Sequence, residues 1–367
     1  MIRMKKIVFP ALLMASIITG CSKNDDGADT VANFNTAKTN AITDFVNIVA
    51  IPAYTELKTK GDALNNSIIA LNASTTDANL TVAKNAWKDM RQTWERSEGF
   101  LLGPVEDGEY DPDTDTWPVN FNDMNNLLAT AQPLGTAANI EALGSRALKG
   151  YHPIEYMLWG QNGNKKAADF TARQKEYLTG LSLHLKSQAD ALYTSWIPAG
   201  GNYANEILKA GAGSTVFAKK QDVFLAICGA LTDICGEVGD GKMKEPFDAA
   251  ATVPSEGAQL VESPFSGNSL TDFKNNLQGA FNSYQGKFNS DGTGLQDLVK
   301  IKNSALNLEI EQKFNAAINS FASITVPFEQ AISTQRTQCQ ATMTAINYLA
   351  NTLDTKLKPF IIQYITD

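Results

Sequence analysis

Two residues that could share a metal ion stand three positions apart in the stretch GYHPIEYMLWG, residues 150–160. His152 is one of only two histidines in the chain, and Glu155 follows it by one helical turn, so both side chains would face the same way. An imidazole and a carboxylate on one helical face can close on a single cation, as Glu-x-x-His pairs do in di-iron bundles. The alternative is a core histidine whose ring is satisfied by a neighbouring carboxylate.

The residues around this pair predict where its helix begins. Gly150 disfavours the continuation of an incoming helix. Pro153 is accepted only in a first turn, where its missing N–H is not needed. A helix therefore begins, or restarts after a kink, near His152.

A second helical segment carries charge on its apolar face. Trp87 and Trp94 are seven residues apart and define one stripe, and Arg91 and Glu98 fall on the same stripe. Because a lone buried charge is costly, these two charged side chains must pair or bind something. A salt bridge between Arg91 and Glu98 would need no ligand. Glu95 points to the side of the stripe, so we expect it to be solvated.

Helical periodicity dominates the rest of the chain, and no alternating strand pattern competes with it. Apolar residues recur at helical spacing from Phe34 to Val49, and Pro52 should kink or end that helix. Gly103 and Pro104 should stop the tryptophan helix. Antiparallel bundles bury such amphipathic faces most simply, so the expected fold is all-α.

The N-terminus has the pattern of a lipoprotein signal. Three basic residues precede an apolar run over 7–18, which is shorter than the roughly 20 residues of a transmembrane helix. The run ends in IITGCS, which resembles a lipobox, so we expect a signal peptide over 1–20, lipidation of Cys21 and a tether over 21–30. A plain signal peptide with a chance cysteine is the alternative. The following SKNDDG resembles an export tag, which predicts lipid anchoring at the outer membrane or cell surface.

Size and loop composition predict two domains. Without residues 1–20 the chain keeps 347 of its 367 residues, more than a single core usually serves. The segment 196–206 is rich in Gly, Asn and Ala and interrupts the helical pattern. We therefore expect two helical-bundle domains, 31–198 and 199–367, of which the first carries the His-x-x-Glu motif.

Charge argues against one class of partner. Without the three basic residues of 1–20, 28 Lys and Arg stand against 39 Asp and Glu, a formal net charge of −11. No basic helix or Arg-rich patch with interleaved aromatic residues appears. Nucleic acid is therefore not an expected partner.

Three cysteines follow the lipobox. Cys228 and Cys235 would share one helical face about 10 Å apart along the axis, too far to bridge each other. One of them could pair with Cys339. The simpler interpretation is three small buried thiols.

Three stretches taken together resemble the imelysin-like family, whose signature is Gly-x-His-x-x-Glu. They are WKDMRQTWERSEGFLLGPVEDGEYDPDTDTWPVNF, GYHPIEYMLWG and VESPFSGNSLTDFKNNLQGAFNSYQG, in the family's order. The resemblance covers essentially the whole chain after the signal. It implies an all-helical fold of two bundle-like halves with a pocket between them. The family includes an insulin-cleaving metallopeptidase, iron-regulated surface proteins and the periplasmic component of a ferrous-iron uptake system.

The resemblance also implies a set of site residues. The signature falls on Gly150, His152 and Glu155, and two further acidic positions of the family fall on Glu98 and Asp115. The expected metal ligands are therefore His152, Glu155, Glu98 and Asp115. The residues expected around the pocket are Gly150, Arg91, Glu262, Ser263 and Ser266.

The chemistry of this set points to a metal ion. One imidazole with up to three carboxylates suits iron, manganese or zinc better than copper(I) or calcium. Together with the resemblance, it predicts an envelope-anchored protein that binds iron, with zinc or manganese as alternatives, for uptake or sequestration beside a partner transporter or surface protein. The alternative is a metallopeptidase with the same ligands and Glu98 or Asp115 as general base. No His-Glu-x-x-His motif is present, which favours metal binding without catalysis.

Overall fold

The computed structural model describes residues 25–366, with side chains from residue 33 onward. The predicted signal peptide over 1–20 and Cys21 lie outside the described residues. Within 25–366 the regular elements are helices and no β-strand occurs, which confirms the all-α fold class. None of the helices in this part of the chain is both long and apolar enough to cross a membrane.

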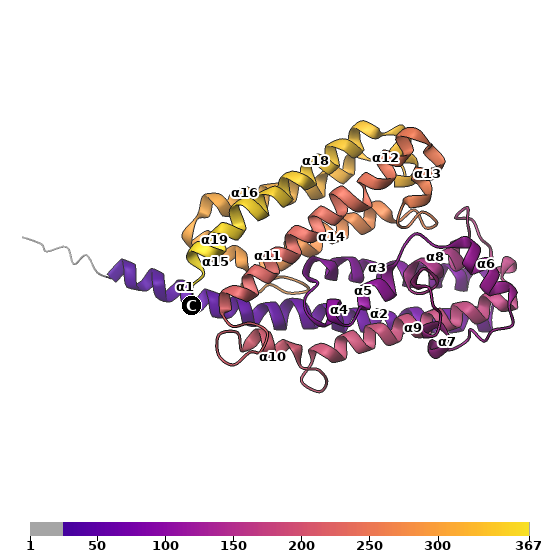
Figure 1. Ribbon diagram of the computed structural model, residues 1–367, viewed down its shortest axis with the longest axis horizontal. Coiled ribbons are helices and arrows are strands. Elements are labelled where there is room, and N and C mark those ends of the chain that lie inside the picture. The colour runs from indigo at the N-terminus through magenta and orange to yellow at the C-terminus, as the bar shows by residue number, and fades with distance from the viewer. Residues whose placement is uncertain (1–24, 367) are drawn as a thin grey trace, which may run out of the picture.

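The first half of the chain is built on three long helices, α2, α3 and α9, which lie side by side with shorter helices at their ends (Figure 1). The elements of this half are α1 (Asp25–Asp44), η1 (Phe45–Ala50), α2 (Ile51–Ala73), α3 (Asp77–Ser97), η2 (Glu98–Phe100), α4 (Pro104–Asp107), α5 (Tyr110–Asp115), α6 (Phe121–Ala129), α7 (Ala137–Glu141), η3 (Arg146–Leu148), α8 (Tyr151–Trp159), η4 (Ala167–Asp169), α9 (Ala172–Trp196) and α10 (Tyr203–Leu208). The helix expected to begin near His152 is α8.

The second half packs α11, α14, α16 and α18 into another bundle, drawn in orange and yellow in Figure 1. Its elements are α11 (Lys220–Gly236), η5 (Glu237–Lys242), α12 (Lys244–Thr252), α13 (Pro254–Leu260), α14 (Ser269–Gln285), α15 (Leu295–Lys302), α16 (Ser304–Ser320), η6 (Phe321–Ser323), α17 (Phe328–Thr334), α18 (Arg336–Thr352), η7 (Leu353–Leu357) and α19 (Lys358–Tyr364). The division into domains at 198/199 stays a prediction.

The two halves meet where α14 crosses α3 and η2. Glycines on both sides allow the backbones to touch: a Cβ added at Gly279 would lie 2.0 Å from the carbonyl oxygen of Arg96, and one at Gly99 would lie 2.3 Å from the backbone nitrogen of Ala280. Real side chains do not approach backbone so closely. The contact therefore brings polar residues of α14 directly against the charged end of α3.

Pro52 neither ends nor interrupts the long N-terminal helix. It is the second residue of α2, and the six residues before α2, Phe45–Ala50, form the π-helical turn η1. Proline removes one N–H and crowds the preceding turn, so a wider turn accommodates it while the chain stays helical. The predicted kink is thus a change of helix type.

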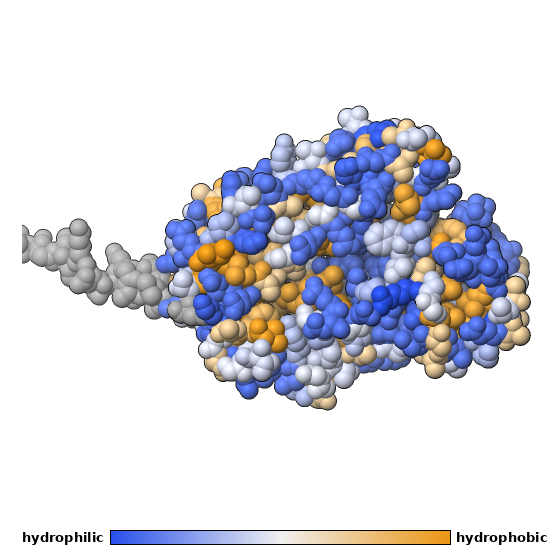
Figure 2. Space-filling view, viewed as in Figure 1, coloured by the Kyte–Doolittle hydropathy of each residue, from blue (hydrophilic) through white to orange (hydrophobic). Residues whose placement is uncertain are grey.

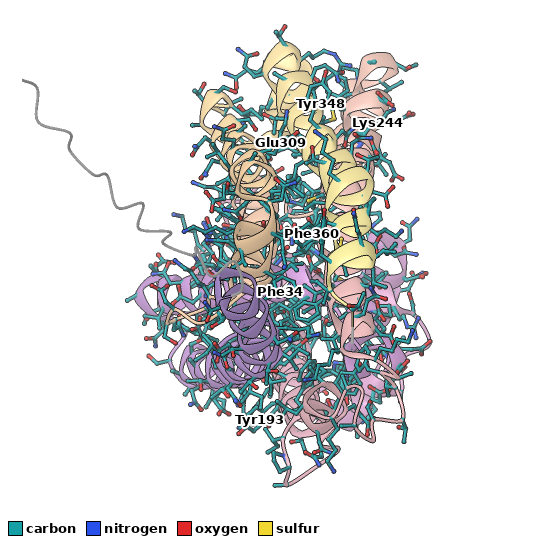
Figure 3. All side chains as sticks on the ribbon, turned by 90° about the vertical axis from the view of Figure 1, so that its left-hand side faces the viewer. Phe34, Tyr193, Lys244, Glu309, Tyr348 and Phe360 are labelled. Atoms are coloured by element: carbon teal, nitrogen blue, oxygen red, sulfur yellow. The ribbon has the colours of Figure 1, made fainter. Side chains whose placement is uncertain are left out.

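The end-on view shows one place where the two halves meet. Phe34 of α1 lies at the junction of the two bundles in Figure 3, with Phe360 of α19 above it, and both side chains are buried. Figure 2 shows that hydrophobic residues form separate patches on a largely hydrophilic face.

The three described cysteines, Cys228, Cys235 and Cys339, are buried free thiols, as the simpler interpretation predicted.

Candidate metal centre

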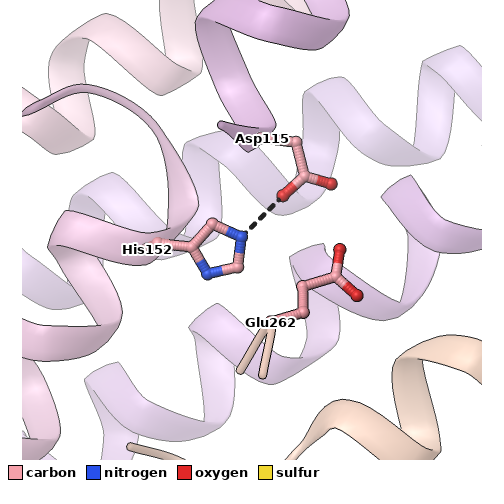
Figure 4. A group of neighbouring side chains, drawn as sticks. All are labelled: Asp115, His152 and Glu262. Carbon is pink, nitrogen blue, oxygen red and sulfur yellow. Dashed lines mark hydrogen bonds and ion pairs between the residues drawn. The ribbon is translucent and has the colours of Figure 1, made fainter. Parts of the chain in front are cut away.

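Three side chains from different elements converge on one point inside the molecule. Asp115 ends α5, His152 lies in the first turn of α8, and Glu262 lies between α13 and α14 (Figure 4). His152 Nε2 is 3.0 Å from Asp115 Oδ1, and the three residues are at most 5% exposed. Each offers one ligand atom, and these atoms all lie within 4.8 Å of one another. One imidazole and two carboxylates in this arrangement could hold a cation.

Gly150 allows Asp115 to approach His152. Its φ angle of 77° lies in the left-handed region. A Cβ at this position would stand 2.0 Å from the carbonyl oxygen of Thr114, the residue directly before Asp115. The end of α5 can therefore pack against the start of α8 only because residue 150 has no side chain.

The tryptophan stripe of α3 holds both Asp115 and the start of α8 in place. Trp87 donates its indole N–H to the carbonyl oxygen of Tyr151 at 3.0 Å, which fixes the start of α8. Trp94 donates its indole N–H to Asp115 Oδ2 at 2.7 Å. The stripe predicted from spacing thus positions the site through hydrogen bonds as well as through packing.

Arg91 stands at the centre of a buried ion network. Its guanidinium contacts Asp115, lies 2.5 Å from Glu95 Oε1 and 2.8 Å from Glu262 Oε1, and reaches Asp272 Oδ2 at 3.7 Å. Arg91 thus pairs with these four carboxylates and not with Glu98, the partner that the ligand-free alternative predicted. Two of the four partners come from the second half of the chain.

The expectation that Glu95 is solvated is wrong. Its side chain is buried, and Asn276 of α14 donates to Glu95 Oε2 at 2.6 Å. The face of α3 beside the tryptophan stripe is covered by the second bundle, which the periodicity of a single helix cannot reveal. Glu95 therefore belongs to the buried network.

Glu98 belongs to a second group of possible ligands, with Glu95 and Asp115. The amide of Asn276 lies 2.5 Å from Glu98 Oε2, and Lys242 Nζ lies 3.1 Å from the same oxygen. Asp115 is common to both groups. The predicted ligands Glu98 and His152 are thus neighbours of the same carboxylate.

Glu155 faces the other side of the imidazole. Its Oε2 is 3.5 Å from His152 Nδ1, and its Oε1 accepts hydrogen bonds from the backbone N–H of Ser266 at 2.7 Å and from the Ser266 hydroxyl at 2.6 Å. A carboxylate in this position fixes the ring and directs Nε2 toward Asp115. Glu155 is in neither group of converging atoms, and its predicted role as a ligand stays a prediction.

The pocket residues predicted with Glu262 lie close to it. Ser263 is buried, and its backbone N–H donates to Ser269 Oγ at 3.1 Å, which shapes the segment before α14. Ser266 ties this segment to Glu155 of α8. The segment from the second half is therefore fastened to the helix that carries His152.

The cluster holds more negative than positive charge. Six carboxylates are buried, against the guanidinium of Arg91, the ammonium of Lys242 and the imidazole of His152. The six are Glu95, Glu98, Asp115, Glu155, Glu262 and Asp272. Like charges at such distances repel strongly where water is excluded. A cation or bound protons must offset the excess.

The pKa values follow from this excess. Burial raises the pKa of Glu95 to about 8 and that of Glu98 well above its usual range. Burial opposes protonation of His152, but its bonds to Asp115 and Glu155 raise its pKa to about 9. Burial also opposes ionisation of Asp115, yet Arg91 and His152 hold its pKa below the usual range. Without a cation, the cluster retains protons.

A pocket of about 280 Å³ lies beside Glu262, one member of this cluster. Glu262 lines it together with Phe121, Phe265 and Glu329. Within the described residues, Glu262 Oε2 and Glu329 Oε2 are buried and have no hydrogen-bond partner. Two unpaired carboxylate oxygens beside one pocket suit a positively charged ligand.

Comparison with known proteins assigns the family. A model of the imelysin family, described as peptidase M75, matches residues 50–355. The chain belongs to the imelysin family. This imelysin is 27% identical over 324 residues to the iron-regulated protein A of Synechococcus elongatus, across 86% of this chain and 85% of the relative.

Solved structures support the same assignment. The imelysin fold described above superposes on the crystal structure of an iron-regulated protein A precursor from Parabacteroides distasonis with a TM-score of 0.79 and 25% identity, over 92% of this chain and 95% of that one. An imelysin-like protein from Psychrobacter arcticum has a TM-score of 0.72 at 14% identity, over 90% and 98% of the two chains. The second likeness concerns the fold alone.

Four residues of the buried cluster were not predicted from the sequence as part of the site. They are Glu95, Lys242, Asp272 and Asn276. Asp272 and Asn276 stand on α14 on the same face as Gly279, at i, i+4 and i+7. Polar residues aligned with a glycine at a helix crossing are a signal that could have revealed two of them. His184, the other histidine, pairs with Glu141 at 2.7 Å and is not part of the cluster.

Proposed function

We propose that this imelysin binds one iron ion through Asp115, His152 and Glu262, for iron uptake or sequestration at the cell envelope. The observation that carries the proposal is the buried excess of carboxylates around a single imidazole. Oxygen-rich donors with one imidazole suit iron, and also manganese or zinc. The name of the iron-regulated relative supports iron among these metals.

The proposed ligand atoms follow from the contacts of each side chain. Glu155 accepts a hydrogen bond from Nδ1 of the His152 ring. Once Nε2 has lost its proton, its lone pair is therefore available to a metal. Glu262 Oε1 is engaged by Arg91 and by Lys242, whereas Oε2 has no partner among the described residues. An ion bound to His152 Nε2 and Glu262 Oε2 would take over part of the contact between His152 and Asp115.

The same contacts favour binding over peptide hydrolysis. A general base needs a carboxylate that is free to accept a proton. Asp115 is held by Arg91 and by Trp94, and Glu98 is held by Lys242 and by Asn276. Both bases expected for a metallopeptidase are thus engaged with donors.

Elemental analysis tests this function directly. We expect protein purified without chelating resin to contain iron in a ratio of one ion per chain, and a chelator to remove it. We also expect no chelator-sensitive cleavage of an unstructured peptide substrate. Cleavage that depends on the metal would favour the peptidase, whereas protein that carries and binds no metal would contradict both functions.

A further inference from the structure

The two groups of converging ligands overlap. Asp115, His152 and Glu262 form one group, and Asp115, Glu95 and Glu98 form the other. Two ligand sets that share a carboxylate are the arrangement of a two-metal centre, in which the common carboxylate lies between the ions. The carboxylates of this cluster therefore offer two positions for cations.

Lys242 already brings a cation to the second position. Its side chain is only 2% exposed, although lysine is seldom fully buried. The ammonium lies 3.1 Å from Glu98 Oε2 and 3.9 Å from Glu95 Oε2. It also lies 3.0 Å from Glu262 Oε1 and 3.4 Å from Glu237 Oε1. The ammonium thus contacts two of the three carboxylates of the second group, and it also contacts Glu262 of the first group and the partly exposed Glu237.

We propose that the Lys242 ammonium substitutes for a second metal ion, so that the centre holds one ion where its carboxylates could hold two. The inference rests on the proposed function, since it concerns the same cluster. It assigns Lys242 as the residue that sets the metal stoichiometry. It also explains why Glu98, although buried beside the site, is not needed as a ligand of the bound ion.

The backbone keeps the ammonium in place. Lys242 ends the π-helical turn η5, whose Val238 and Gly239 are buried. A Cβ at Gly239 would lie 2.4 Å from Asn347 Oδ1 of α18, so the turn packs tightly against that helix. A lysine anchored in this way is a fixed charge and cannot swing freely to solvent. Unusual π turns often mark functional positions in helices.

The substitution has a chemical consequence. Paired metal ions hold a water or a substrate oxygen between them and promote hydrolysis. An ammonium donates hydrogen bonds but offers no open coordination position. The exchange of one ion for Lys242 therefore leaves a centre suited to bind and release a single metal ion.

Lys242→Met is the test, because methionine keeps most of the side-chain volume and removes the charge. Each protein is dialysed against excess Mn²⁺, and bound metal is counted by elemental analysis. We expect one ion per chain for the wild type, two for Lys242→Met, and one for the control Lys244→Met. Lys244 is an exposed lysine two residues away that pairs with Asp248. Electron paramagnetic resonance should show a coupled Mn²⁺ pair only in Lys242→Met.

Each result has a defined meaning. One ion in Lys242→Met, or two in the wild type, would overturn the inference while leaving metal binding intact. A wild type without metal beside a variant that gains an ion would contradict the proposed function and support the role of Lys242. Metal in neither protein would overturn both.

Folding of the variant is covered by a second measurement. If Lys242→Met does not fold alone, it is refolded in excess Mn²⁺, since a second ion should replace the missing charge. Recovery of a folded chain with two ions supports the inference. A chain that stays unfolded at saturating metal contradicts it.

Discussion

Thr114 and Gly150 lie in direct contact, because the carbonyl oxygen of Thr114 occupies the space that a Cβ of residue 150 would fill, 2.0 Å from its position. This contact joins the end of α5 to the start of α8. It places Asp115 Oδ1 3.0 Å from His152 Nε2. The glycine of the signature is thus explained by the approach of two backbone segments.

Gly150→Ala should separate the two segments. A left-handed non-glycine residue alone costs about 1–3 kcal/mol, and the clash with Thr114 adds to this. We expect a lower urea midpoint and a loss of metal affinity. The matched control is Gly144→Ala, since Gly144 is exposed, has an ordinary φ angle and has no neighbour within 4 Å of a Cβ. Equal urea midpoints for the two variants would contradict this account.

Trp94→Phe should weaken the site while keeping an aromatic ring. It removes the hydrogen bond to Asp115 Oδ2, and a bond to a charged group contributes about 1.5–3 kcal/mol. We expect lower stability and weaker binding of Mn²⁺. Trp196→Phe is the control, because the indole N–H of Trp196 is buried and has no partner among the described residues. A larger loss of stability in the control than in Trp94→Phe would refute the assignment.

The stability of the metal-free protein should fall as pH rises. The pKa of His152 is about 9 in the folded protein against 6.5 in the unfolded chain, and that of Glu95 is about 8 against 4.5. The folded chain therefore binds more protons, so stability is lost as pH rises. The His152 contribution is complete below about pH 6.5 and lost through about pH 9. Metal affinity should rise over the same interval, because the ion needs a neutral imidazole.

Urea unfolding near pH 6, 7.5 and 9 measures this dependence in chelator-treated protein. His152→Gln should lose part of the change between pH 7.5 and pH 9, whereas the part due to Glu95, whose pKa is about 8, should remain. A midpoint that stays constant or increases from pH 6 to pH 9 in the wild type would show that the cluster does not retain protons.

The parts of the site that depend on local sequence could be predicted. Gly150 and Pro153 mark the start of α8, and the spacing of Trp87 and Trp94 gives the stripe that carries Arg91. Spacing alone could not bring Asp115 to His152, and that expectation came from the family resemblance. The pair His152 and Glu155 could be predicted because the two residues lie one helical turn apart.

The remainder of the cluster depends on contacts between distant segments. The solvent exposure of Glu95 was predicted wrongly because the helical period shows only where the apolar stripe of α3 lies. It does not show that α14 covers a second face of α3. Lys242 lies in a glycine-rich turn with no sequence feature that predicts burial. Its position follows from the packing of η5 against α18. Such contacts need the fold before they can be inferred.

Lipid anchoring is a separate prediction from the sequence. Cys21→Ala should move the protein from the membrane fraction to the soluble fraction, because a diacylated cysteine would provide the anchor. The folded chain should be unchanged, so its melting temperature is the control. Recovery of Cys21→Ala in membranes after a high-salt wash would contradict the lipoprotein assignment.

The central claim is that His152 belongs to the metal centre, and the second histidine provides a matched comparison. Anaerobic calorimetric titration of Fe²⁺ into the wild type, His152→Ala and His184→Ala measures affinity, with thermal melts of each protein with and without the ion. We expect the wild type and His184→Ala to bind one ion and to melt at a higher temperature with it. His152→Ala should lose about 100-fold or more in affinity. Identical wild-type melting curves with and without Fe²⁺, Mn²⁺ and Zn²⁺, or undiminished affinity in His152→Ala, would contradict the account.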